Sequence, residues 1–128
     1  MIAATVFNVH MPEKSIDIPV TSTGDDAIAI VLTTVGADFD AVAIARILVE
    51  EQLAACVNVL PVMTSVYQWK GKAEQDQEQQ LVIKTTASNV ARLAARLRAL
   101  HPYELPEFLV LRASASEQYG KWVGESVG

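Results

Sequence analysis

The chain has 128 residues, of which 51% are hydrophobic, so it can bury a core of its own without metal or disulfide support. Its 10 Lys and Arg against 15 Asp and Glu give a net charge of −5, which provides no general attraction to nucleic acid or to anionic membranes. With 1 Cys and no apolar run of about 18 residues, the sequence predicts a cytoplasmic protein without disulfides or membrane spans.

Residues 1–27 differ from the rest of the chain because prolines and a cluster of turn-forming residues interrupt them. Short β-prone pieces lie at 4–9 and 15–20, but no hydrophobic period is sustained. We therefore expect an N-terminal extension at 1–27 and one domain at 28–128.

The first core elements follow directly. The β-branched apolar run at 28–35 is typical of a buried central strand. Asp38 is a suitable N-cap for a helix of about four turns, in which Ala41, Ile44 and Leu48 recur at helical spacing.

The next segments predict a long, interrupted hairpin. The residues at 54–60 alternate in a strand-like way, Pro61 interrupts them, and the pattern resumes at 63–70 before a turn at Gly71. The Glu- and Gln-rich stretch 73–80 fits a solvated loop or helix by composition, and its pattern alone leaves its structure open. The apolar run that follows it, 81–86, is clearly a strand.

The C-terminal third contains two further helices and a strand. Ser88 is suited to cap a second helix, which Pro102 must end, and a strand follows at 107–113. A short helix at 116–126 completes the chain. The order is βαββαβ plus a terminal helix, which predicts an α+β, ferredoxin-like sandwich with both helices on one face of a four-stranded sheet.

Common enzyme motifs are missing: the sequence has no phosphate-binding loop, no glycine-rich dinucleotide motif, no His-Glu-x-x-His helix and no nucleophile elbow. We therefore expect a protein that is not an enzyme. The candidate soft or borderline metal ligands are Cys56, His10 and His101. Cys56 also fits a small core residue, and His101 also fits a helix C-cap.

Polar groups on the stiff loop 101–107 form a second candidate feature, because two prolines hold Tyr103, Glu104 and Glu107 close in sequence to His101. A purely structural turn is an equal interpretation. Tyr67 and Trp69 on the hairpin are either the edge of the core or an exposed interface. The carboxylates within 73–80 are most simply a solvated face, with ion binding as the alternative.

Five segments together identify a family resemblance. These are AACVNVLP at 54–61, SVYQWKGK at 65–72, LVIKTT at 81–86, HPYELPE at 101–107 and YGKW at 119–122. In this order and spacing they resemble the CutA divalent-cation-tolerance family, from about residue 28 to residue 126.

The resemblance implies a ferredoxin-like protomer in a tight homotrimer similar to the P-II signalling proteins, with the long hairpin reaching into neighbouring sheets. It implies that 73–80 is the returning hairpin strand. It also implies a link to copper and other divalent cations, and by position it makes Cys56, His101 and Glu107 the metal candidates.

The leading hypothesis is a non-enzymatic cytoplasmic homotrimer that binds copper or another divalent cation weakly and contributes to metal tolerance, without an organic cofactor. Mixed thiol, imidazole and carboxylate ligands suit copper or zinc better than calcium. The alternative is a P-II-like regulatory or scaffold module that binds a small ligand or a partner protein in an intersubunit cleft. No nucleic-acid or membrane partner is expected.

Overall fold

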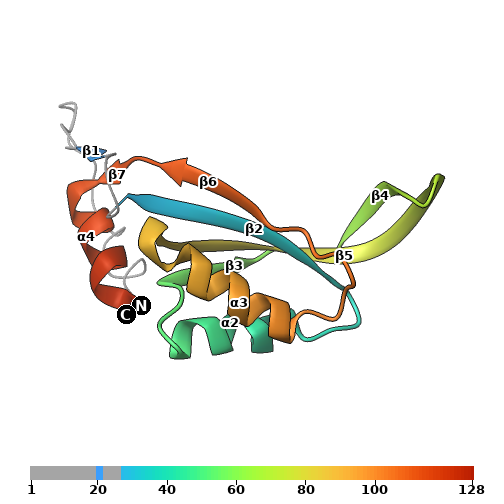
Figure 1. The fold of residues 1–128 in the computed structure, drawn as a ribbon, viewed down its shortest axis with the longest axis horizontal. Helices are drawn as coiled ribbons and strands as arrows, with labels where there is room; N and C mark the ends of the chain where they lie inside the picture. Colours follow the sequence, from blue (N-terminus) through green and yellow to red (C-terminus); the bar gives the residue numbers. More distant parts are fainter. Residues whose placement is uncertain (1–19, 22–26) are drawn as a thin grey trace, which may run out of the picture.

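The computed structural model describes residues 20–21 and 27–128, which form a mixed α/β fold with helices packed on an antiparallel sheet (Figure 1). The elements in chain order are β1 (Val20–Thr21), β2 (Ile28–Gly36), α2 (Ala41–Glu50), β3 (Cys56–Val59), β4 (Met63–Trp69), β5 (Lys72–Thr86), α3 (Val90–Leu100), β6 (Leu109–Ala113), β7 (Ala115–Ser116) and α4 (Glu117–Ser126). The β-prone piece at 4–9, and that at 15–20 apart from its last residue, lie outside the described residues.

The main sheet has the strand order β3-β5-β2-β6, and each neighbouring pair is antiparallel. The apolar run beginning at Ile28 becomes the inner strand β2, as its sequence predicts. β5 pairs with β2 along its C-terminal half and with β4 along its N-terminal half. One long strand therefore joins the body of the domain to the hairpin.

The core lies between one face of this sheet and the helices α2 and α3, which Figure 1 shows together below the sheet. Alternate side chains of β2 and β5 point into it, because successive residues of a strand face opposite sides. The largest fully buried apolar side chains of this cluster are Val31, Val35, Leu48, Leu81, Ile83 and Leu93.

The opposite face of the sheet is also apolar. The register pairs Leu32 with both Val82 and Leu109, and it pairs Ile30 with Leu111, so these side chains share one face. Leu109 is 53% exposed and Leu111 52% exposed. We call Ile30, Leu32, Val82, Leu109 and Leu111 the open sheet face.

The strands β4 and β5 form a hairpin that extends beyond the helices (Figure 1). Lys70 and Gly71 both have positive φ, at 51° and 81°, between the paired residues Trp69 and Lys72. Positive φ at both central residues is the signature of a type I′ turn, whose twist matches that of the strands. The Glu- and Gln-rich stretch 73–80 lies within β5, which confirms the strand expected from the family resemblance.

A one-residue bulge separates β3 from β4. Val59 pairs with Leu81 and Met63 pairs with Glu78, so three residues on one strand oppose two on β5. The interruption predicted at Pro61 is confirmed. A bulge of this kind increases local twist and redirects the strand.

Two predicted helix starts are wrong. Asp40, not Asp38, caps α2, because its Oδ1 accepts the N–H of Ala43 at 3.0 Å. The helix has 10 residues, fewer than the four turns expected. Ser88 does not cap α3; it lies in a 3₁₀ turn at Ala87–Asn89 that precedes the helix.

The C-terminal predictions hold more closely. α3 ends before Pro102, with His101 as its C-cap in an extended conformation, as expected for a residue before proline. The strand predicted from 107 begins two residues later, at Leu109. In α4, the Ser116 Oγ accepts the N–H of Tyr119 at 3.3 Å and caps the helix.

Val20 and Thr21 of the predicted N-terminal extension form β1, which pairs with β7, the short strand that precedes α4. Val20 is opposite Ser116, and Thr21 is opposite Ala115, in an antiparallel ladder. This short pairing connects the extension to the segment that leads into α4.

Candidate functional site

His101 is positioned by the end of α3 and by the edge of the sheet. Its Nε2 lies 2.6 Å from the carbonyl oxygen of Thr34. β6 pairs with β2 only as far as Leu32, so Thr34 lies beyond that ladder and the imidazole supplies a donor there. A carbonyl can only accept, so Nε2 carries the proton. The backbone N–H of Tyr103 donates to Nδ1 at 3.1 Å, which fixes the neutral Nε2–H tautomer.

Tyr103 extends this chain of hydrogen bonds to the base of the hairpin. Its hydroxyl donates to Glu78 Oε2 at 2.6 Å, and its ring lies 4.8 Å from that of His101 between centroids. Glu78 is only 8% exposed. Burial raises the pKa of Tyr103, and the hydrogen bond to the Glu78 carboxylate raises it further, so the phenol remains a donor.

Glycine at position 36 leaves room for this arrangement. Gly36 is the cross-strand partner of Glu78. A Cβ at Gly36 would lie 2.7 Å from an Asp38 carboxylate oxygen and 3.4 Å from the Tyr103 hydroxyl. A larger residue would therefore crowd the loop that leads into α2 and the phenol.

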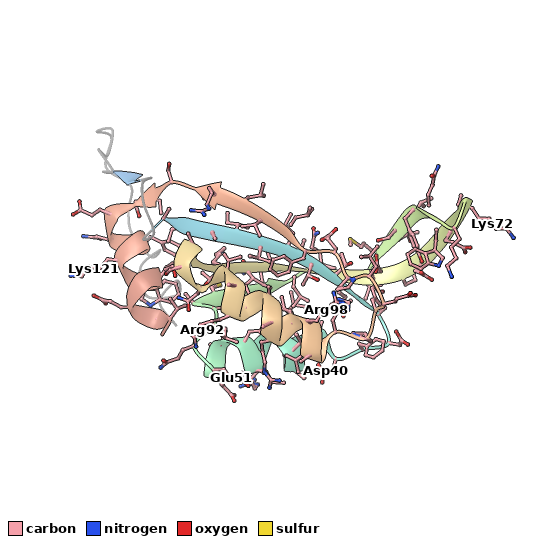
Figure 2. The ribbon with its side chains drawn as sticks, viewed as in Figure 1. Asp40, Glu51, Lys72, Arg92, Arg98 and Lys121 are labelled. Carbon is pink, nitrogen blue, oxygen red and sulfur yellow. The ribbon has the colours of Figure 1, made fainter. Side chains whose placement is uncertain are left out.

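Glu107 reaches the same part of the sheet from the other end of the proline loop. The Gln80 amide donates to Glu107 Oε2 at 3.2 Å, and Gln80 is the cross-strand partner of Thr34. His101 and Glu107 are therefore hydrogen-bonded to the two members of one cross-strand pair, His101 to Thr34 and Glu107 to Gln80. They also line one pocket of about 180 Å³, with Thr33, Ala94, Leu97, Arg98, Leu105, Pro106 and Phe108. Figure 2 shows Arg98 on α3.

Cys56 lies elsewhere in the protomer. It is partly buried on β3, directly opposite Lys84 on β5. Lys84 is four residues along β5 from Gln80, which contacts Glu107. At roughly 3.3 Å per residue this separation is about 13 Å. The structure therefore brings together His101 and Glu107 but not Cys56.

The donor set within one protomer is incomplete as a metal site. In the described ranges 20–21 and 27–128, no three His, Cys, Asp or Glu side chains are grouped so as to hold a metal ion. Both ring nitrogens of His101 already have hydrogen-bond partners. A cation in this pocket would have two protein ligands from this set and would need to displace one of those bonds.

The hairpin carries a second polar cluster. The Tyr67 hydroxyl donates to Asp76 Oδ2, and this bond, with further carboxylates on the same strand, raises the pKa of Tyr67 to about 12. Tyr67 is 39% exposed and Trp69 37% exposed, so neither is at the edge of the core. Their exposure favours the interface interpretation of the sequence.

Sequence reasoning did not identify Glu78 and Gln80 as partners of the loop. A usable signal was present. Once 73–80 is taken as a strand, alternation places residues 74, 76, 78 and 80 on one face. The last two of these are at the body of the domain, where the proline loop passes.

A separate groove of about 290 Å³ lies between α2 and β3, lined by Val42, Ala45, Arg46, Val49, Glu50, Val57 and Val59. It is mostly apolar and includes none of the three predicted site residues. Among the described helices, none combines the length and apolar character needed to cross a membrane.

Comparison with known proteins gives a consistent result. Residues 29–126 match the family described as "CutA1 divalent ion tolerance protein". The "Divalent-cation tolerance protein CutA" of Thermus thermophilus is 45% identical over 100 residues, covering 77% of this chain and 97% of the relative. The solved structure of the Thermus thermophilus protein has a TM-score of 0.75 at 44% identity, over 79% of this chain and 99% of that one. The "PII-like protein CutA" from Nostoc has a TM-score of 0.73 at 36% identity, over 78% and 97%.

Proposed function

Because the chain belongs to the CutA1 divalent ion tolerance family, we propose that it is a non-enzymatic homotrimer that binds copper or zinc weakly and contributes to metal tolerance. The protomer is ferredoxin-like, as the strand order β3-β5-β2-β6 supports, and it works in the cytoplasm. The observation that carries the proposal is that His101 and Glu107 share one pocket at the Thr34–Gln80 pair.

The proposed cation site consists of a His101 ring nitrogen and the Glu107 carboxylate. Imidazole and carboxylate are borderline and hard ligands, a set that divalent copper and zinc accept. Two protein ligands leave the remaining coordination positions to water, which predicts weak binding. Glu107 is partly buried and accepts one hydrogen bond from Gln80, which orients the carboxylate.

Cys56 has a lesser part in this proposal. The row of cross-strand partners Cys56, Lys84, Ile30 and Leu111 places the thiol on the same side of the sheet as the open sheet face. A neighbouring protomer that covers this face would place Cys56 near a subunit boundary. Within one protomer the thiol is too far from Glu107 to complete the site.

The trimer rests on unpaired edges and exposed apolar surface. In the part of the chain that the structure describes, β6 pairs with β2 alone and β4 with β5 alone, so each has a free edge. β6 also exposes Leu109, Val110 and Leu111. An exposed apolar edge strand is an aggregation hazard unless another chain covers it. We assign that cover to the hairpin strand β4 of a neighbouring protomer.

Titration calorimetry tests the cation site. Wild type should bind divalent copper or zinc, and His101→Ala and Glu107→Ala should bind more weakly, whereas Cys56→Ser should retain most of the affinity. Light scattering after gel filtration checks that every variant keeps about three times the 13.9 kDa chain mass. Equal copper binding by all variants would move the site elsewhere.

A P-II-like regulatory or scaffold module is the second candidate, with a small ligand or a partner protein in an intersubunit cleft and cation binding incidental. One relative with a similar structure is described as "PII-like protein CutA". Absence of copper and zinc binding by the intact trimer, with retained thermal stabilisation by a small metabolite, would favour this candidate.

A further inference from the structure

The hydrogen bonds that hold His101 use both of its ring nitrogens. Nε2 donates to the Thr34 carbonyl at 2.6 Å, and Nδ1 accepts the Tyr103 N–H at 3.1 Å. In this tautomer the single free lone pair of the ring is on Nδ1, where the Tyr103 N–H already points. A metal ion binds imidazole only through such a lone pair.

Each route to a bound cation therefore breaks a link of this chain. Ligation through Nδ1 displaces the Tyr103 N–H. Ligation through Nε2 needs the proton to move to Nδ1, which ends the bond to Thr34 and turns two N–H groups toward each other. The cation and the observed loop conformation compete for the same imidazole.

Tyr103 transmits this competition to the hairpin. Its backbone N–H binds His101, and its hydroxyl binds Glu78 at 2.6 Å. Glu78 pairs with Gly36 on one side and with Met63, the first residue of β4, on the other. One residue thus joins the proposed cation ligand to the point where the hairpin leaves the sheet.

We propose that Tyr103 and Glu78 are positioning residues that hold His101 in the Nε2–H tautomer, and that cation binding at His101 releases Tyr103 and so couples the pocket to the hairpin base. This inference rests on the proposed cation site. The conformation in which Tyr103 binds both His101 and Glu78 competes with cation binding. A change that weakens the Tyr103–Glu78 bond destabilises this conformation and should therefore raise the affinity for the cation.

The first test uses zinc ion with the trimeric protein. Without zinc, nitrogen-15 NMR should show the Nε2–H tautomer of His101, and the Tyr103 amide should exchange slowly with solvent. Zinc should shift the His101 ring resonances and accelerate exchange of the Tyr103 amide. An Nδ1–H tautomer in the zinc-free protein overturns the inference. So does zinc binding that leaves the Tyr103 amide unchanged, although the cation site itself would then stand.

The second test measures zinc affinity by calorimetry in Tyr103→Phe and Glu78→Gln. Tyr103→Phe removes the phenol donor and should bind zinc about fivefold more tightly, at the lower end of usual coupling energies. Glu78→Gln replaces a charge-assisted bond by a weaker neutral one and should give a smaller gain in the same direction. Tyr67→Phe, which removes a phenol–carboxylate bond farther along the hairpin, is the matched control and should bind like wild type.

The outcomes separate cleanly. Tighter binding by both variants supports the coupling. If zinc affinity rises in Tyr103→Phe but not in Glu78→Gln, the freed Glu78 carboxylate ligates zinc. If zinc affinity in Tyr103→Phe is unchanged or lower, Tyr103 does not compete with the cation. Either result overturns the inference. Failure of every protein to bind zinc overturns the proposed cation site and the coupling with it.

Discussion

Replacing Leu111 by Glu should dissociate the proposed trimer while leaving the protomer folded. Leu111 is on the open sheet face and is 52% exposed within one protomer. Covering the remaining half of a leucine is worth roughly 1 kcal/mol, since full burial contributes about 1.5–3 kcal/mol. Three copies in a trimer would lose about 3 kcal/mol, which corresponds to about a hundredfold change in an equilibrium constant.

The carboxylate adds a further penalty. Burying an unpaired ion costs several kcal/mol in folded proteins, and the trimer would bury three. In a single protomer the same side chain is half in solvent and is tolerated. We therefore expect Leu111→Glu to elute near the 13.9 kDa chain mass under conditions in which wild type elutes near three times that mass.

Light scattering over a dilution series measures this effect, and circular dichroism checks that the variant is folded. Val42→Glu is the matched control, because Val42 is 55% exposed but lies on α2, away from the open sheet face. It should remain trimeric. A Leu111→Glu protein that keeps the wild-type mass at every dilution would refute the use of this face. Monomeric Val42→Glu would show that exposed charge alone disrupts assembly.

Three further predictions concern stability and titration. Gly71→Ala should lower the free energy of unfolding in urea by about 1–2 kcal/mol, because Gly71 has a φ of 81°. Gly124→Ala, within α4, should raise the free energy of unfolding by about 0.5–1 kcal/mol. An added Cβ meets nothing within 4 Å at either glycine, so the two substitutions differ only in backbone conformation, and equal effects on stability would contradict this explanation. Thr85→Val should cost about 1–3 kcal/mol, since it leaves a loop carbonyl without the buried hydroxyl that donates at 2.8 Å; an unchanged urea midpoint would refute this. Phenolate absorbance should show that Tyr67 titrates with a pKa of about 12 rather than 10. Because this pKa is raised in the folded protein, the stability contributed by the Tyr67–Asp76 bond is fully present below pH 10 and is lost as the pH rises through 12. Asp76→Asn should move that step back toward 10, and an unmoved step would exclude the carboxylate as its cause.

The fold could be predicted wherever local pattern and tertiary packing agree. The buried strand at Ile28–Gly36 and the end of α3 before Pro102 follow from apolar runs and from proline geometry. The stretch 73–80 could not be assigned from its residues, because Glu and Gln have low strand propensity and its pairing with β2 and β4 overrides that preference.

The helix starts failed for a more local reason. Asp38 and Asp40 are both acceptable caps by residue type, and the turn that passes Gly36 decides between them. Ser88 does not cap α3, because the Asn89 side-chain amide donates to the Thr86 hydroxyl at 2.8 Å and this bond favours a 3₁₀ turn before the helix. Each choice depends on contacts one or two residues outside the motif.

The candidate site was predictable in part. The stiff loop between His101 and Glu107 pointed to a shared location, and both residues line one pocket. The sequence could not show that the His101 ring nitrogens are already used, because the Thr34 carbonyl and the Tyr103 N–H are backbone groups. It also could not place Cys56, since the distance depends on the register of β3 against β5.

The extra residue at 60–62 determines which side chains of the hairpin share a face. Before the extra residue, odd-numbered residues of β3 share a face with odd-numbered residues of β5. After it, odd-numbered residues of β4 share a face with even-numbered residues of β5, so Tyr67 is opposite Glu74. Deleting one residue there would turn Tyr67 and Trp69 to the other side of the hairpin and place Val66 and Gln68 on the side that they now occupy. A change of one residue in the length of this segment should therefore reverse which face of the hairpin carries Tyr67 and Trp69, whereas a change of two residues should preserve it.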